Sequence, residues 1–211
     1  MNQVNMQNFI LLLLFFSINL FSQDSKKILD LVSEETKSWK NISIDFELLY
    51  NNKDEEVFEK KIGNVVFEQE KFKLELDNQI VVCNGEYQWI YNKESNEVQI
   101  IEYDKNNDFF NPKRLLSIYE NEYEIKNDLN YNEKSNLFQK IDLFPIKNDN
   151  ELLKLSLIID VKNKRISKIE AIENVGSVIT YNFLNYKFNI ENLVFDFDTS
   201  LYDDIYIIDL R

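Results

Sequence analysis

Alternation of apolar and polar residues with a period of two runs through most of this chain and constrains the fold more than any other feature. In the segment ISIDFELLY, the alternation places Ile42, Ile44, Phe46, Leu48 and Tyr50 on one face of a strand, with polar residues opposite. Comparable strands are expected over residues 57–67, 72–76, 80–83, 86–91, 98–103, 123–126, 137–144, 152–161, 165–172 and 177–188. The pattern predicts a mainly β (α+β) protein, built on one antiparallel sheet with few helices.

Two segments show helical spacing instead. Residues 25–39 repeat apolar side chains at Ile28, Leu31, Val32 and Trp39, and either Asp24 or Ser25 can cap the helix. A second, short helix is expected from Asn111-Pro112, an N-cap followed by proline at the first helical position. The apolar residues around it that are available to pack are Phe109, Phe110, Leu115, Leu116 and Tyr119.

Turn signals divide the strands without dividing the chain into domains. Asn84-Gly85 is a strong signal for a two-residue hairpin. Gly63, inside a predicted strand, suggests a bend or bulge. The 3 glycines and 2 prolines form no linker, so residues 23–211 are expected to fold as a single domain.

Residues 1–22 carry no charged side chain and are expected to act as a signal peptide. The apolar run from Phe9 to Phe16 suits a signal-peptide core and is too short to span a membrane. Ser22 offers a cleavage point, and no cysteine near it could carry a lipid anchor. The sequence therefore predicts export to a soluble compartment; a buried N-terminal helix is the alternative.

The chemistry available to the chain is narrow. It contains no histidine, and Cys83 is its one cysteine, so internal disulfides, common catalytic triads and most zinc sites are excluded. Three glycines cannot build a glycine-rich phosphate loop. Cys83 is expected to be a buried, inert thiol, and paired acids such as Asp45 and Glu47 to lie on a solvated face. We expect no enzyme activity, no metal and no cofactor.

The net charge of −13 arises from 24 basic and 37 acidic residues. Such a field repels nucleic acid and anionic membrane surfaces, and would suit a basic protein partner. Acidic surfaces also serve solubility alone.

One stretch is unusually aromatic, because Tyr87, Trp89 and Tyr91 alternate along a single strand. We expect them to share a broad apolar face with residues of the neighbouring strands, namely Phe72, Leu74, Val98 and Ile100. Two helices are few to cover so much apolar sheet. The face could be a dry, packed core, or it could line a cavity that binds acyl chains.

The order of these features resembles the outer-membrane lipoprotein carrier family (LolA-type), in its Bacteroidetes-like form. The similar stretches are KKILDLVSEETKSWKNISIDFELLY, IGNVVFEQEKFKLEL, IVVCNGEYQWIYNKESNEVQI, NPKRLLSIYENEYEI, LSLIIDVKNKRISKIE and the terminal IDLR. They cover essentially the whole chain after residue 22. Some carriers have a basic residue after the glycine-led strand that helps to close a lid; here the region reads Phe67-Glu68-Gln69-Glu70, so that latch is not expected.

The resemblance implies an unclosed antiparallel β half-barrel with a lid of a few helices over an apolar cavity. It implies a monomeric periplasmic carrier that takes lipoproteins by their acyl chains from an inner-membrane ABC-type release complex, with an outer-membrane acceptor possible. The expected acyl-chain-binding residues are Ile44, Phe46, Leu48, Phe67, Phe72, Leu74, Tyr87, Trp89, Tyr91, Val98, Ile100, Leu155 and Leu157. The expected lid residues are Phe109, Phe110, Leu115, Leu116 and Tyr119.

Two other functions remain open at the level of sequence. A similar half-barrel could serve as a periplasmic envelope-stress or signalling protein that binds lipids. An exported enzyme acting on polysaccharide would need two carboxylates facing one sugar, and no acidic pair stands out for that role.

Overall fold

The structure is a computed structural model that describes residues 20–104, 122–147 and 152–211. It contains one helix, α2 (Leu20–Ser38), and one short 3-10 helix, η2 (Thr199–Leu201), in these ranges. The strands are β1 (Ile42–Asn52), β2 (Val57–Glu68), β3 (Lys71–Leu76), β4 (Gln79–Cys83), β5 (Tyr87–Asn92), β6 (Glu97–Glu102), β7 (Tyr123–Glu133), β8 (Asn136–Pro145), β9 (Leu152–Asp160), β10 (Arg165–Glu173), β11 (Val178–Phe188) and β12 (Tyr206–Asp209). Each strand expected from the alternation is present.

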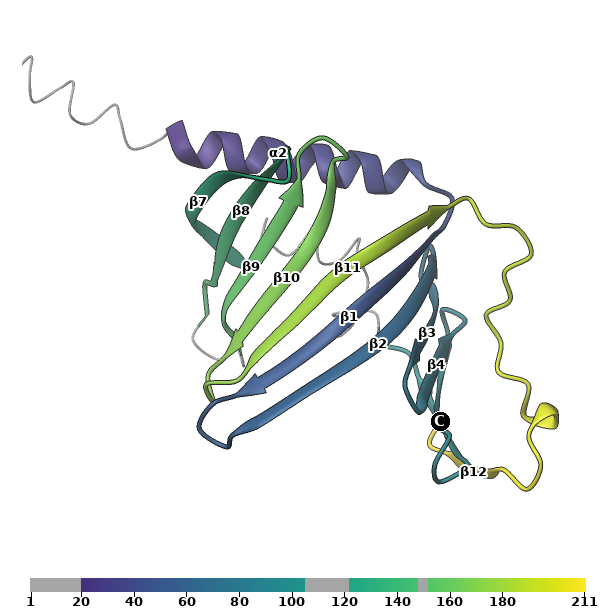
Figure 1. The fold of residues 1–211 in the computed structure, drawn as a ribbon. Coiled ribbons are helices and arrows are strands. Elements are labelled where there is room, and N and C mark those ends of the chain that lie inside the picture. The colour runs from purple at the N-terminus through teal and green to yellow at the C-terminus, as the bar shows by residue number, and fades with distance from the viewer. Residues whose placement is uncertain (1–19, 105–121, 148–151) are drawn as a thin grey trace, which may run out of the picture.

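All the strands join one sheet in the order β12-β6-β5-β4-β3-β2-β1-β11-β10-β9-β8-β7. Two meanders, β1 to β6 and β7 to β11, meet where β1 pairs with β11 from Ile42↔Phe188 to Asn51↔Val178, with one register shift between Asp45 and Phe46. The sheet is strongly curved and does not close, since β12 and β7 are its two ends (Figure 1). The mainly β, unclosed architecture is therefore confirmed. The expected helix at 112–120 and the lid residues lie outside the described part of the chain.

Helix α2 forms where the sequence predicts it, although it begins earlier, at Leu20, so Asp24 is not its cap. Its apolar stripe packs onto β7 and β10, with Leu29 and Val32 almost completely buried. Burying such side chains contributes about 1.5–3 kcal/mol each. The helix defines the two faces of the sheet, which we name the helix face and the outer face.

Asparagine side chains shape three of the hairpins. Asn52, Asn84 and Asn92 each accept hydrogen bonds from two backbone N–H groups two and three residues later, at 2.9–3.2 Å. Such Asx turns satisfy the backbone without glycine. In the β4–β5 hairpin, Asn84 N–H donates to Tyr87 O, so the loop residues are Gly85 and Glu86. The predicted hairpin exists, but its turn lies one residue later than expected.

The chain after β11 crosses from one side of the sheet to its far edge. Buried Asn41 holds its start, because its side chain accepts from Ile190 N–H (2.7 Å) and donates to Ile190 O (2.9 Å). We name residues 189–205 the tail; it runs to β12, which pairs with β6 in parallel (Figure 1). The sheet is thus antiparallel except at this edge. Phe195 and Phe197 alternate with aspartates but lie in the tail, outside any strand.

Candidate functional site

The helix face carries a continuous apolar surface across both meanders. One row of register partners runs Ile141↔Leu157↔Ile169↔Tyr181↔Leu48, from β8 to β1. A second row begins on β1 and continues to β5 through residues Ile44, Val65, Leu74, Val81 and Ile90. The rows meet on β1, so the apolar surface passes from one meander to the other without a break. This surface is the candidate site.

Two clusters of buried side chains divide this face. The first lies under α2 on β7 to β10, and its centre is fully buried at Ile141, Leu157 and Ile159. The second lies on β1 to β4. Apart from the strands, the described residues that pack against the second cluster are Trp39 and Tyr103. Helix α2 therefore covers the first cluster and does not contribute to the second.

Partly buried side chains connect the two clusters. Tyr181 and Phe183 on β11 pack against both clusters, and Leu48 and Ile90 border the second. Burial raises the pKa of Tyr181 to about 12, because the charged phenolate would lose water. A neutral, apolar environment in the middle of the sheet is the physical cause of that shift.

Gly63 leaves room for a neighbouring side chain and does not form the bulge that the sequence suggested. β2 pairs with β1 through Gly63 without a register shift, so the predicted bulge is absent. A Cβ at Gly63 would lie 2.6 Å from Cζ of Phe46 and 2.9 Å from the carbonyl oxygen of Glu75. The glycine is needed so that the Phe46 ring can lie across β2 on the helix face.

Helix α2 is fastened to the sheet by a small polar cluster as well as by apolar contacts. Ser25 Oγ donates to Oδ2 of Asp128, and Gln139 Nε2 donates to the same oxygen at 2.7 Å. The other oxygen of Asp128, Oδ1, is buried without a hydrogen-bond partner among the described residues. Ser25 therefore anchors the helix rather than capping it.

Aromatic side chains at the C-terminal end of β11 pack at one end of the helix face, next to Trp39. Tyr186 donates its hydroxyl hydrogen to Ile166 O. The Arg165 guanidinium lies over the Tyr186 ring, with its central carbon 4.8 Å from the ring centroid. Burial raises the pKa of Tyr186. Phe188 stacks beside it and contacts Trp39 at 4.5 Å between ring centroids. These contacts fix β11 against the end of α2.

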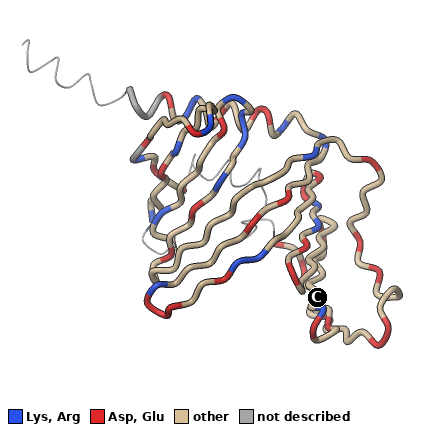
Figure 2. The backbone as a smooth tube through the Cα atoms, in the orientation of Figure 1, with Lys and Arg blue, Asp and Glu red and all other residues tan. Residues whose placement is uncertain are grey.

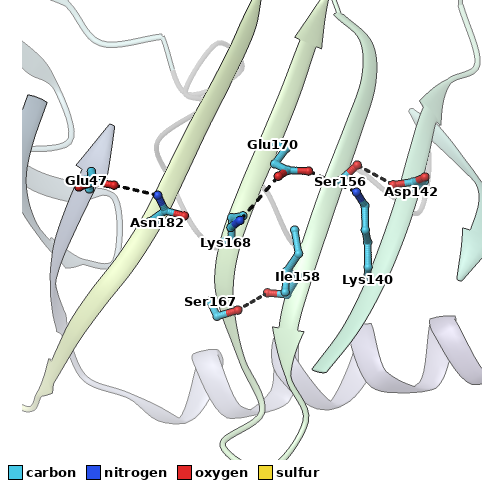
Figure 3. A network of polar contacts seen from close by, with 9 residues as sticks. All are labelled: Glu47, Lys140, Asp142, Ser156, Ile158, Ser167, Lys168, Glu170 and Asn182. Carbon is cyan, nitrogen blue, oxygen red and sulfur yellow. Dashed lines mark hydrogen bonds and ion pairs between the residues drawn. The ribbon is translucent and has the colours of Figure 1, made fainter. Parts of the chain in front are cut away.

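The outer face of the central strands is polar and pairs its own charges (Figure 3). Lys140 and Lys168 both reach Glu170, at 3.2 and 3.7 Å. Ser156 donates to Asp142 at 2.5 Å, as the same view shows. Glu47 accepts from Asn182 at 3.1 Å, and hydrogen bonding from Lys60 lowers the pKa of this carboxyl group. Such exposed pairs are worth little each and mark a solvated surface.

The aromatic strand β5 faces the other way from the prediction. Ile90 pairs with Val81 on the helix face, so Tyr87, Trp89 and Tyr91 lie on the outer face with Val98 and Ile100. Phe72 and Leu74 lie on the helix face, opposite Cys83 and Val81. The prediction that all seven residues share one face is therefore wrong. The cause is that both faces of β4 are apolar, so alternation alone does not say which one is the helix face.

The tail covers this outer aromatic surface. Phe197 and Tyr202 stack at 4.9 Å between ring centroids, and both contact the ring of Tyr91, at 5.4 and 4.6 Å. Together with Val82 and Val98, they form a third buried cluster. Tyr91 is thus part of a core made by the tail.

The predicted site residues therefore separate into three groups. On the helix face lie Ile44, Phe46, Leu48, Phe67, Phe72, Leu74, Leu155 and Leu157. On the outer face lie Tyr87, Trp89, Tyr91, Val98 and Ile100. Phe109, Phe110, Leu115, Leu116 and Tyr119 lie outside the described residues. Their role in binding acyl chains stays a prediction for all three groups.

Sequence reasoning missed several residues of the helix face, including Val65, Leu76, Ile90, Tyr181 and Phe183. A signal was present for the last two, because they alternate with Thr180 and Asn182 on β11. Cys83 is buried, as expected for an inert thiol. The backbone N–H of Gly85 donates to its sulfur at 3.4 Å.

Two further properties bear on the kind of site. Within residues 20–104, 122–147 and 152–211, no group of three or more His, Cys, Asp or Glu residues is arranged to hold a metal ion. Among the same residues, no helix has the length and apolar character needed to span a bilayer.

The family model described as outer membrane lipoprotein carrier protein LolA matches residues 37–198. A comparison with curated protein sequences finds no match.

Solved structures with a similar fold share little sequence with this chain. An uncharacterized conserved protein from Thermus thermophilus is 12% identical, with a TM-score of 0.54, and the match covers 88% of this chain and 99% of that one. A LolA superfamily protein from Nitrosomonas europaea is 11% identical, with a TM-score of 0.39 and coverages of 84% and 96%. LprF from Mycobacterium bovis is 11% identical, with a TM-score of 0.47 and coverages of 82% and 96%.

Proposed function

Because the chain belongs to the outer membrane lipoprotein carrier protein LolA family, we propose that it binds lipoprotein acyl chains on the helix face and carries them from the inner to the outer membrane. The observation that carries this proposal is the unbroken apolar surface on which the two rows of side chains meet at β1. An acyl chain forms no hydrogen bonds and binds through apolar contact along its length, and this surface is long and apolar.

The proposal places the ligand on one face only. Leu48, Leu76, Ile90 and Phe183 are partly buried side chains of that face, so part of their apolar surface is accessible. Each methylene of a bound chain would contribute about 0.8 kcal/mol when it leaves water. The aromatic residues of β5 lie on the outer face, where Tyr91 and Trp89 pack in the cluster with Phe197 of the tail, so the proposed site on the helix face does not include them.

The rest of the proposal follows from the family. The carrier would act as a periplasmic monomer after removal of residues 1–22, take its cargo from an inner-membrane ABC-type release complex and pass it to an outer-membrane acceptor. It would make and break no covalent bond. The absence of histidine from the chain is in keeping with a binding protein.

The test compares a carboxylate placed on the helix face with one placed on the outer face, at neighbouring positions of the β1–β2 pair. Leu48→Asp puts a charge on the helix face, and Ile62→Asp puts one on the outer face, where Ile62 is 54% exposed. A carboxylate desolvated against an acyl chain costs several kcal/mol, so Leu48→Asp is expected to lower lipoprotein release from spheroplasts roughly tenfold or more. Ile62→Asp is expected to leave release unchanged.

Mass spectrometry of the purified parent should also detect bound lipoprotein or acyl chains. Circular dichroism and thermal unfolding establish that each variant is folded, and Leu76→Asp provides a second helix-face variant should Leu48→Asp unfold. Release that is equal in the parent and in a folded helix-face variant would place the ligand elsewhere. A parent that neither retains acyl chains nor releases lipoproteins is not a carrier.

A further inference from the structure

Strand β12 gives the sheet an edge that is ordered, apolar and acidic. In the strand order, β12 is the last strand beyond β6. N–H groups of Tyr206 and Leu210 bond to Asn96 O and Ile100 O, both at 2.9 Å. Since the backbone groups of a strand point to alternate sides, the N–H and C=O groups of Ile207 and Asp209 point away from β6.

The side chains of this edge are unusual for a strand end. Tyr206, Ile207 and Leu210 are 64%, 47% and 62% exposed. Exposed edges of this kind pair readily with another strand, and proteins usually protect them with very short strands, charged side chains, proline or a bulge. β12 is short and carries Asp209, but residues 206–210 contain no lysine and no proline, and the pairing of β12 with β6 has no bulge.

Acidic residues lie along the tail and at this edge, and Asp203, Asp204 and Asp209 are the ones in or next to β12. Residues 189–211 contain six acids, Glu191, Asp196, Asp198, Asp203, Asp204 and Asp209, against one base, Arg211. That base is already paired with Asp209 at 2.5 Å. These 23 residues therefore carry −5 of the net −13 (Figure 2).

The edge is held in place before any partner arrives. Asn96 Nδ2 donates to Asp203 O at 2.9 Å, and the Arg211 guanidinium lies 4.8 Å from the ring centroid of Tyr87. The packing of Tyr202 on Tyr91 anchors the chain just before the strand. A fixed strand loses less conformational entropy on binding than a flexible one, so the edge is preorganised to pair.

We propose that the outward edge of β12 is a docking site for an extended segment of a protein partner that alternates apolar and basic residues. The segment would add a strand beyond β12, accept and donate hydrogen bonds at Ile207 and Asp209, and place Lys or Arg beside Asp203 and Asp204. A second copy of the chain is disfavoured, because its own charge of −13 opposes an edge of the same sign. This site does not depend on the helix face or on acyl-chain binding.

The test uses the chain lacking residues 1–22 and a labelled ten-residue peptide that alternates valine and lysine. Fluorescence anisotropy should detect binding that weakens with salt, and a peptide with glutamate in place of lysine should not bind. Amide hydrogen exchange at Ile207 and Asp209 should slow when the valine-lysine peptide binds. The exchange readout locates the contact on the outward groups of β12.

Two variants separate the strand edge from the charge. Ile207→Pro removes an outward donor and leaves the bonds to β6 in place, and should weaken binding about tenfold without changing the unfolding midpoint. Asp203→Asn with Asp204→Asn should weaken binding and flatten its salt dependence. The matched control, Glu55→Gln with Glu56→Gln, makes the same charge change in the exposed β1–β2 turn and should bind like the parent.

Binding unaffected by both Ile207→Pro and the Asp203/Asp204 variant would overturn the proposal. So would the absence of any binding by the valine-lysine peptide. Sedimentation that shows a dimer of the parent, lost in Ile207→Pro, would assign the edge to a second copy instead. Acyl-chain binding is measured without peptide, so either proposal can fail while the other stands.

Discussion

Gly63→Ala is the change that most directly tests how the helix face is packed. The added Cβ would lie 2.6 Å from Phe46 Cζ, 2.9 Å from Glu75 O and 3.0 Å from Leu76 Cδ1, so at least two neighbours must move. Phe46 is 3% exposed and has little room to shift. Overpacking of this kind costs about 1–3 kcal/mol, and alanine returns about 0.5–1 kcal/mol by restricting the unfolded chain. We expect a net loss of about 1–2 kcal/mol of unfolding free energy.

The assay is urea unfolding followed by tryptophan fluorescence, with thermal unfolding as a second measurement. For a chain of this size, the loss corresponds to a midpoint lower by about 2–8 °C. The double variant Gly63→Ala with Phe46→Leu should show a favourable coupling energy, because the shorter side chain removes the closest contact. The Glu75 O contact remains, so the rescue should be partial. A Gly63→Ala protein as stable as the parent, or stabilities that simply add, would refute this account of Gly63.

Three further outcomes follow from burial and charge. Leu157→Ala, at a fully buried position, should cost about 2–5 kcal/mol in urea unfolding, whereas Leu129→Ala, 61% exposed, should change stability by less than about 0.5 kcal/mol; equal effects would contradict the assigned faces. Hydrogen bonds from Arg211 lower the pKa of Asp209 to about 2, so the stabilising pair persists above the unfolded pKa and is lost only as pH falls through about 2. Arg211→Gln should raise that pKa toward 3.8 in a carboxyl NMR titration, and an unchanged value would show that the pair is absent in solution. Burial raises the pKa of Tyr181 to about 12, so the stability present below pH 10 should fall as pH rises toward 12. Because burial also raises the pKa of Tyr186, alkaline absorbance should show that Tyr181→Phe lacks one of the late-titrating tyrosines of the parent, and a Tyr181→Phe protein that keeps all of them would contradict the assignment.

The strands were predictable from sequence because alternation is a local property. Each strand that borders the core shows its period of two, and Asn84-Gly85 marked a real hairpin. What alternation does not supply is the relation between one strand and the next. On β4, Val81 and Val82 are both apolar, and only the pairing register shows that Val81 lies on the helix face. Assigning the residues of β4 to the wrong faces led to the wrong face being predicted for all the aromatic residues of β5.

The tail could not be predicted for a different reason. Phe195 and Phe197 alternate with aspartates as strand residues do, yet both are buried outside any strand, and Phe197 packs against Tyr91, more than one hundred residues earlier in the chain. The long-range aromatic contact between Phe197 and Tyr91 is not encoded in any local sequence pattern. The parallel pairing of β12 with β6 follows from the same crossing.

The two coverings of the sheet explain where a ligand surface can exist. Helix α2 covers the helix face at β7 to β10, and the tail covers the outer face at β4 to β6, so each protects one end of the sheet on one side. Between them lie β11, β1, β2 and β3. Their outer face carries charged and polar side chains together with exposed Ile62, whereas their helix face is apolar and, among the described residues outside the strands, meets Trp39 and Tyr103. A sheet must bury such a face against something. Under the proposed function, the acyl chain would bind in this middle part of the helix face, against partly buried side chains such as Leu48 and Phe183.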